Sequence, residues 1–189
     1  MRTRFVLLAS VVAALFTCLA QGQTTQKIDN AFVQRTFGKD FTMVQEVGGM
    51  VGDMDGDGIE DVVIAARCKN PLLDQGEHNY SVIDPYDTFF GYGDPKVTTT
   101  FVQDDPTKRG LVVLIIHGAG SEGWHAETPK AKYVVINLPY RALTVRRMKL
   151  KKKTLQAIYA EEGNALGETA ALFFDGKAYK YVPMGSSME

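Results

Sequence analysis

The sequence predicts a mainly-β protein with antiparallel meander sheets, blade-like or sandwich-like, and one short N-terminal helix. The second half of the chain carries successive short runs of Val, Ile, Leu, Tyr and Phe, each bounded by turn residues. The connections between these runs are short, as in antiparallel hairpins. No strand–helix alternation runs along the chain, which argues against a doubly wound α/β sheet.

Residues 1–22 have the features of a secretory signal peptide. Arg2 and Arg4 precede an apolar run from Phe5 to Leu19, and small residues around Ala20 suit signal peptidase. The run is shorter than the roughly 20 residues of a membrane span, so no span is expected after cleavage. The sequence therefore predicts a secreted or periplasmic protein.

Cys18 leaves a second alternative, a lipid-modified N-terminus. The preceding Phe16 and Thr17 fit a lipoprotein signal poorly, so ordinary secretion is favoured. Only Cys68 remains after cleavage, which excludes an internal disulfide. The remaining residues 23–189 are long enough for a single domain with its own core. Their mildly acidic balance gives no indication of a nucleic-acid partner.

The first elements of the expected fold are a helix and two strands. Asp29 or Asn30 can cap a helix over residues 31–37, in which Ala31, Phe32 and Arg35 have helical spacing, and Gly38 ends it. A strand over residues 41–47 is expected to end at Gly48-Gly49. Residues 61–65 have the continuous apolar pattern of a buried strand.

The middle of the chain is loop-rich, and the role of residues 67–110 stays open. Short strands are expected there over residues 80–83 and 97–102. Six further strands are predicted over residues 111–116, 133–138, 142–150, 154–160, 169–174 and 177–182. Asp175-Gly176 between the last two predicts a hairpin with a type I′ turn, which needs positive φ at both positions.

The most informative segment is the acidic loop, residues 53–61, which follows the pattern D-x-D-x-D-G-x-x-D. Calcium binds six to eight oxygen atoms, and carboxylates at alternate positions can turn inward together. We therefore expect a calcium site built from five residues, Asp53, Asp55, Asp57, the Ile59 carbonyl and Asp61. Gly58 allows the sharp turn that such a loop needs. A solvated acidic turn without an ion is the alternative.

The loop differs from an EF-hand, because Ile64 stands where an EF-hand places a bidentate Glu and the flanking segments resemble strands. Residues 37–66 instead resemble the FG-GAP repeat, also called the VCBS-type repeat. The resemblance runs from Phe37-Gly38 through the acidic loop to Ala65, and it implies calcium bound within a β-hairpin by the five residues named above. The family's closing Gly-Ala-Pro is Ala65-Ala66-Arg67 here.

The resemblance implies a metal loop and no propeller, because the motif occurs once and a propeller needs four or more blades. The predicted function is accordingly an exported, non-enzymatic calcium-binding protein in which the ion is structural. One alternative is an envelope-binding or adhesion module that holds a polymer or protein through its β surface or the basic run 146–153. On an edge strand, these lysines would instead prevent edge-to-edge aggregation. Met148 and Leu150 are then expected to face inward.

A secreted serine hydrolase is the weakest alternative. His117-Gly118 is similar to an oxyanion loop, and Ser121 lies in a segment that resembles a nucleophile elbow. An elbow serine must be followed in the chain by an acid and then a His, yet only His125 follows, four residues on. We therefore expect a glycine-rich turn and no enzyme.

Three further features have structural explanations. The histidines His78, His117 and His125 lack metal-ligand spacing, and Trp124 is expected to be packing or the rim of a surface pocket. Aromatic residues alternate across the final hairpin, where cross-strand pairing explains them: Phe173, Phe174, Tyr179 and Tyr181.

Overall fold

The computed structural model describes residues 27–85, 89, 108–151, 153–163 and 167–185. The predicted signal peptide, Cys18 and the predicted strand over residues 97–102 lie outside the described residues. The predicted mainly-β class is confirmed, since the described part of the chain forms two sheets with few helices. Among these residues no helix is long and apolar enough to cross a membrane.

The first sheet has the strand order β1-β3-β5-β6-β4, and β2 also pairs with β3. Its strands are β1 (Thr42–Met43), β2 (Gly49–Gly52), β3 (Asp61–Arg67), β4 (Ser81–Ile83), β5 (Leu111–His117) and β6 (Ala131–Val135). All pairs are antiparallel except β4 and β6, which are parallel. This parallel pair departs from the predicted antiparallel arrangement, because β4 comes from the middle segment whose pattern the sequence leaves open.

The second sheet is the predicted meander, with the order β10-β9-β8-β7 and antiparallel pairing throughout. Its strands are β7 (Ala142–Leu150), β8 (Lys153–Glu161), β9 (Ala170–Phe174) and β10 (Tyr179–Pro183). Both ends of each strand lie within two residues of the ends predicted from the sequence. Short connections between apolar runs therefore identified this sheet correctly.

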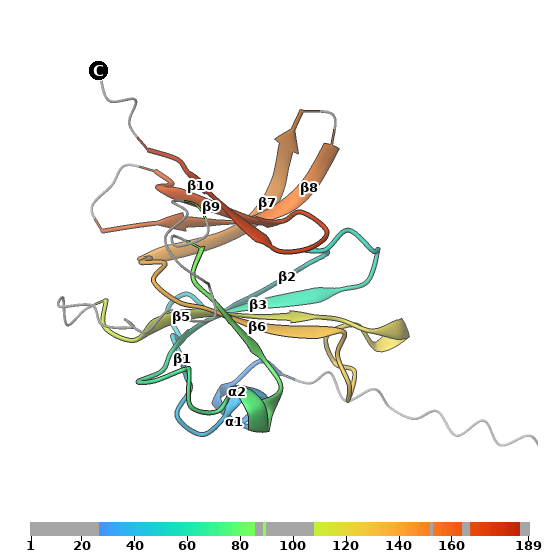
Figure 1. The fold of residues 1–189 in the computed structure, drawn as a ribbon, viewed down its shortest axis with the longest axis vertical. Coiled ribbons are helices and arrows are strands. Elements are labelled where there is room, and N and C mark those ends of the chain that lie inside the picture. Colours follow the sequence, from blue (N-terminus) through green and yellow to red (C-terminus); the bar gives the residue numbers. More distant parts are fainter. Residues whose placement is uncertain (1–26, 86–88, 90–107, 152, 164–166, 186–189) are drawn as a thin grey trace, which may run out of the picture.

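The two sheets and the helices stack in three layers (Figure 1). Alternate residues of the central strand β3 serve the two interfaces: Val63 and Ala65 pack toward the second sheet, and Val62 and Ile64 toward helix α1 (Asn30–Phe37). The short helix α2 (Gln75–His78) lies on the same face as α1. Both faces of the first sheet are covered, which explains why β3 and β5 have continuous apolar sequences.

Helix α1 begins and ends as its sequence predicts. The Asp29 carboxylate accepts a hydrogen bond from the Phe32 N–H at 2.9 Å, and Gly38 follows the last residue with φ of 119°. The buried side chains are Phe32, Val33 and Phe37. Ala31 and Arg35, which share the predicted helical spacing with Phe32, are exposed.

The predicted strand over residues 41–47 is interrupted. After β1 the chain turns through residues 45–47 and resumes pairing as β2 at Gly49, so Gly48-Gly49 does not end the strand. Ala65 holds both sides of this turn: its carbonyl accepts from Val44 N–H at 2.9 Å, and its N–H donates to the Gly48 carbonyl at 3.1 Å. The extra residues therefore loop out while β3 stays continuous.

The final hairpin forms, but without the predicted type I′ turn. Gly176 has φ of 99°, whereas its neighbours in the turn have negative φ. The Asp175 carboxylate instead accepts hydrogen bonds from the N–H groups of Lys177 and Ala178, at 2.8 and 2.9 Å. This Asx-type contact removes the need for a second residue with positive φ. The predicted cross-strand pairing of aromatics is found between Phe174 and Tyr179, whose ring centroids lie 5.3 Å apart.

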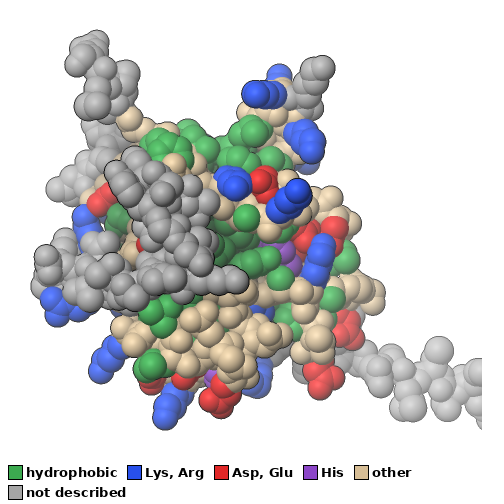
Figure 2. Space-filling view, in the orientation of Figure 1, with side chains coloured by type: hydrophobic (Ala, Val, Ile, Leu, Met, Phe, Trp, Pro, Cys, Tyr) green, Lys and Arg blue, Asp and Glu red, His purple; other side chains and the backbone are tan. Residues whose placement is uncertain are grey.

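Strand β7 is the edge strand that carries the basic run, as the aggregation argument expects. Figure 2 shows Lys and Arg side chains gathered over the β7–β8 hairpin. Met148 is buried, but on the outer face of the second sheet. Leu150 is 36% exposed, so its expected inward orientation is wrong. The hairpin extends past the first sheet (Figure 1), so the described strands of that sheet do not cover its tip.

Candidate metal site

The acidic loop connects β2 to β3 and organises itself around Asp53. The Asp53 carboxylate accepts backbone hydrogen bonds from Gly56 at 2.8 Å, Asp57 at 3.1 Å and Gly58 at 3.0 Å. Gly56 and Gly58 have φ of 78° and 83°, a region that disfavours residues with a side chain. The loop sequence thus holds a tight turn in which successive N–H groups point at one carboxylate.

Asp61 anchors the loop to the rest of the fold. Its side chain is buried and accepts from the N–H groups of Met54 at 2.7 Å and Gly118 at 2.7 Å, with Asp55 N–H at 3.3 Å. The Met54 side chain is 1% exposed and belongs to the core between the two sheets. Because of these contacts, the start of β3, the acidic loop and the end of β5 form one structural unit.

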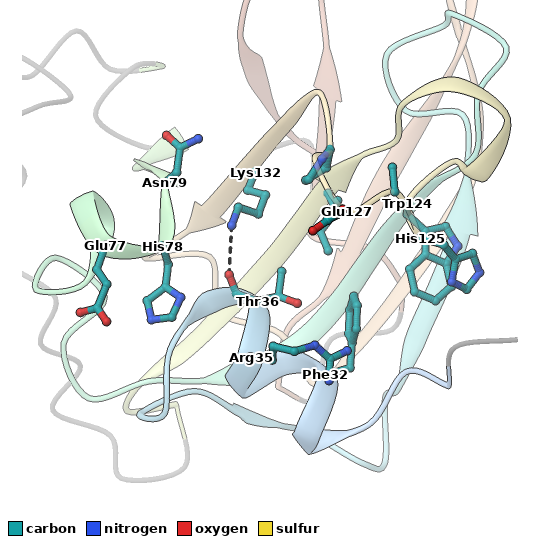
Figure 3. A pocket seen from close by; sticks show the side chains of 13 residues that line it. Phe32, Arg35, Thr36, Glu77, His78, Asn79, Trp124, His125, Glu127 and Lys132 are labelled. Atoms are coloured by element: carbon teal, nitrogen blue, oxygen red, sulfur yellow. Dashed lines mark hydrogen bonds between the residues drawn. The ribbon is translucent and has the colours of Figure 1, made fainter. Parts of the chain in front are cut away.

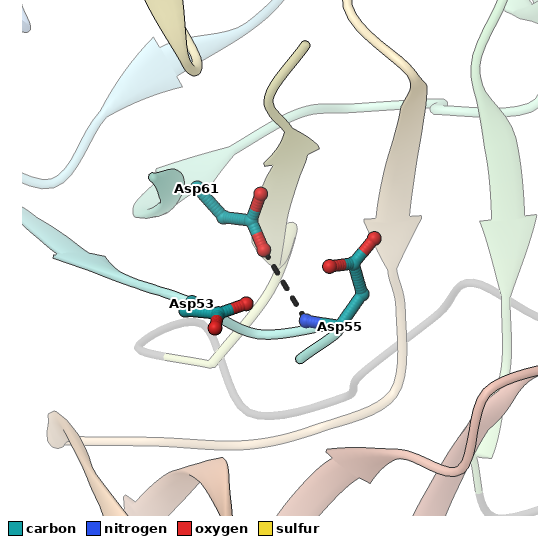
Figure 4. A group of neighbouring side chains, drawn as sticks. All are labelled: Asp53, Asp55 and Asp61. Atoms are coloured by element: carbon teal, nitrogen blue, oxygen red, sulfur yellow. Dashed lines mark hydrogen bonds between the residues drawn. The ribbon is translucent and has the colours of Figure 1, made fainter. Parts of the chain in front are cut away.

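Three carboxylates converge at this point. Asp53, Asp55 and Asp61 each offer one oxygen, and these atoms lie within 4.8 Å of one another (Figure 4). Hard oxygen ligands in this arrangement suit a divalent cation such as Ca²⁺, Mg²⁺ or Mn²⁺. The cluster could therefore hold a metal ion, with two ligands from the loop and one from the first residue of β3.

Asp57, a further predicted ligand, lies differently. Asp57 is not part of the cluster of three; one of its carboxylate oxygens accepts from the Ile59 N–H at 2.8 Å. The other lies 2.7 Å from the Lys130 ammonium. An ion in the cluster would recruit Asp57 only after its carboxylate leaves the Lys130 ammonium. The Ile59 carbonyl stays a predicted ligand.

Lys130 is a residue of the site that the sequence did not indicate. Its ammonium donates to Asp55 at 2.6 Å as well as to Asp57, and these contacts raise the pKa of Lys130. The hydrogen bond from Lys130 to Asp57 is also the main cause that lowers the pKa of Asp57. The Lys130 ammonium thus neutralises Asp55, as a bound cation would.

His117 also lies beside the acidic loop. Its Nδ1 is 3.5 Å from an Asp55 oxygen, and its Nε2 shares a 2.8 Å hydrogen bond with the Tyr179 hydroxyl. Burial lowers the pKa of His117, so the imidazole is neutral at pH 7. The antiparallel pairing of β3 with β5 explains the placement, since Val62 pairs with Ile116 and His117 is the next residue.

Burial also governs Asp61. Loss of solvation raises its pKa to about 6, although the N–H groups of Gly118 and Met54 act in the opposite direction. A metal ion adjacent to this oxygen would favour the ionised carboxylate. Proton and metal therefore compete for the most buried ligand of the cluster.

The remaining sequence candidates do not join this cluster. Ser121 lies in the one-turn helix η1 (Gly120–Glu122), which closes a tight loop between Ala119 and Gly123. A Cβ on Gly118 would approach the Glu60 carbonyl oxygen to 2.3 Å, so the His-Gly pair has a steric explanation. His78, His125 and Trp124 line a separate pocket. Comparison with known proteins finds no matching family model, curated protein or solved structure.

Proposed function

We propose that this chain is an exported calcium-binding protein, not an enzyme, in which the ion braces the acidic loop against the first sheet. The observation that supports the proposal is the approach of Asp53, Asp55 and Asp61 oxygens to within 4.8 Å of one another. The resemblance of residues 37–66 to an FG-GAP repeat supports the same assignment. Export rests on the N-terminal sequence alone.

Calcium suits the loop better than magnesium does. Mg²⁺ requires near-ideal octahedral geometry at short distances, whereas Ca²⁺ accepts six to eight oxygens in flexible arrangements. Three carboxylates, completed by Asp57, the Ile59 carbonyl and water, give such a flexible set. The carboxylates of Asp53 and Asp61 already accept hydrogen bonds from backbone N–H groups. Because fewer of their lone pairs are free for an ion, the coordination of that ion would be irregular.

The ion would stabilise the folded state by linkage. Extracellular calcium modules bind with dissociation constants of about 10⁻⁴–10⁻³ M, which matches a calcium-rich compartment. At a calcium concentration ten times the dissociation constant, the free energy of unfolding rises by about 1.4 kcal/mol. Such a gain is large enough to measure in a thermal melt.

Thermal unfolding of the secreted form tests the proposal in EDTA, in calcium and in magnesium. We expect calcium to raise the melting temperature more than magnesium does, and Asp55→Asn to abolish the rise. Glu60→Gln removes a carboxylate from the same loop at an exposed position outside the cluster, so it is the matched control and retains the rise. Equal melting temperatures in EDTA and calcium contradict the proposal.

The exposed basic residues of the β7–β8 hairpin favour a second candidate, an anionic envelope polymer as partner. Four of them lie on the protruding hairpin: Arg147, Lys149, Lys151 and Lys153. Sedimentation with cell-envelope fractions, compared with a variant carrying these residues as Gln, tests this candidate. Equal co-sedimentation of the two proteins contradicts it and leaves edge protection as the role of the basic residues.

A further inference from the structure

A pocket of about 450 Å³ lies on the helix-covered side of the first sheet, away from the acidic loop. Its walls come from α1, α2, the segment that follows β5, and β6. In the view of Figure 3, the α2 residues Glu77 and His78 are at one side, Trp124 and His125 are at the other, and Lys132 is between them. The volume is within the usual range for small-molecule sites.

Trp124 lines this pocket, and its buried indole N–H is an unsatisfied donor. The side chain is 5% exposed, and its Nε1 has no hydrogen-bond partner among the described residues. Its ring is held by an edge-on contact with Phe32 at 5.4 Å and by stacking on His125 at 3.6 Å. A buried N–H without an acceptor is unfavourable, and a fixed ring cannot turn to find one.

Lys132 adds a cation that lacks a counter-charge. Its ammonium donates to the Thr36 carbonyl at 3.1 Å and lies 5.8 Å from the centroid of the Phe37 ring. Within the described part of the chain it forms no ion pair. Partial burial lowers its pKa, because loss of solvation disfavours the charged form. An anion in the pocket would supply the missing charge.

The rim of the pocket limits the charge of that anion. Arg35, Glu77 and Glu127 are exposed lining residues, and none of them forms an ion pair with another described residue. The carboxylates of Glu77 and Glu127 place negative charge at the rim without pairing to Lys132. Repulsion from these carboxylates grows with the charge of the anion, so a multiply charged phosphate is opposed more strongly than a monoanion. Phe32, which lines the pocket, offers apolar surface to the body of a ligand.

We propose that this pocket binds a small organic monocarboxylate, with its carboxylate at Lys132 and its apolar body against Phe32. The site is independent of calcium, because none of its lining residues belongs to the acidic loop. It extends the function of the protein from metal binding to the capture of a small anionic molecule.

Fluorescence titration tests the proposal directly, since Trp124 is the single tryptophan of the chain. Benzoate serves as the probe. Benzamide lacks its charge, acetate lacks its apolar body, and inorganic phosphate is an anion of another class. We expect a saturable change with benzoate in calcium and in EDTA alike, a weaker response to acetate, and none with benzamide or phosphate.

Two variants assign the contacts, with circular dichroism to verify folding. Lys132→Met keeps the aliphatic stem and is expected to weaken benzoate binding at least about tenfold. Lys177→Met, at the exposed tip of the final hairpin, is the matched control and keeps full affinity. Trp124→Phe, followed by calorimetry, keeps an aromatic ring at the wall of the pocket and is expected to retain benzoate binding.

Three results would each overturn the assignment: no saturable response to benzoate, equal binding of benzamide, or unchanged affinity in Lys132→Met. Tighter binding of phosphate than of benzoate would overturn the monocarboxylate class. If Lys132→Met fails to fold, the benzamide comparison still decides the outcome. Loss of calcium binding alone affects the proposed function and leaves this proposal intact.

Discussion

The acidic loop and the Lys132 pocket are two polar sites of opposite construction. The loop takes its cluster of carboxylates from nine consecutive residues, and the backbone N–H groups of the same segment orient them. The pocket collects Phe32, Glu77, Trp124 and Lys132 from four separate segments. A contiguous motif can therefore be recognised in the sequence, whereas a pocket built from separate segments can be recognised only in the folded structure.

The first test asks whether the loop is as self-contained as its sequence implies. Asp61→Ala leaves two short N–H donors, Met54 and Gly118, without their acceptor. We expect a loss of about 3 kcal/mol or more in the free energy of unfolding, even in EDTA. Urea denaturation measures it, and Glu60→Ala serves as the exposed control with a change within about 0.5 kcal/mol. A mild effect of Asp61→Ala would show that the loop folds without its anchor.

A second test concerns Gly118, which lies between the two sites. A Cβ there would approach the Glu60 carbonyl oxygen to 2.3 Å and Gly123 to 2.5 Å, both backbone atoms. We expect Gly118→Ala to cost about 1–3 kcal/mol of stability by forcing these segments apart. It should also weaken calcium binding and alter Trp124 emission together. A change at one site alone would show that the acidic loop and the pocket are not structurally coupled through Gly118.

A third test uses pH to distinguish the sites. Since the pKa of Asp61 is raised to about 6, the protonated form dominates below that pH and cannot serve as a ligand. Calcium affinity should fall by roughly tenfold per pH unit below about pH 6 and level off above it. Calorimetric titrations between pH 4.5 and 8 check this, with Asp61→Asn as the comparison. A flat profile in the parent protein would remove Asp61 from the ligand set.

The smallest expected effect concerns Lys130, the exposed lysine that pairs with the acidic loop. Lys130→Met removes the charge that neutralises Asp55 and Asp57. We expect calcium to bind roughly fivefold more tightly, about 1 kcal/mol, because the ion no longer displaces the ammonium. Lys132→Met, two residues along, leaves calcium affinity unchanged. Weaker calcium binding in Lys130→Met would mean that the ammonium organises the site and does not compete for it.

The elements with strong local signals were predicted almost to the residue. Asp29 and Gly38 bound α1 because each supplies a specific terminal hydrogen bond or backbone conformation. Strands β7 to β10 follow the apolar runs because each is a hairpin neighbour of the next. Two of the errors lie where a nearby contact replaced the expected one, at Ala65 in the interrupted strand and at Asp175 in the final turn.

The candidate metal site was predicted in part. Asp53, Asp55 and Asp61 come together as their spacing implies, because the turn that joins them is local. Asp57 faces Lys130 instead, and Lys130 belongs to a segment about 70 residues away. His117 reaches Asp55 through the pairing of β3 with β5, which strand patterns alone did not assign.

The sequence by itself determined the mainly-β class, the capped helix, the terminal meander and the nine-residue loop whose carboxylates converge. Only the tertiary structure decided that the first sheet is covered on both faces, that Lys130 is paired with the loop, and that Trp124 and Lys132 share a pocket. The physical reason is the separation along the chain of the residues that each kind of interaction connects. Hydrogen bonds within a turn or helix end connect residues a few positions apart, whereas layer packing brings together groups whose separation along the chain carries no signal.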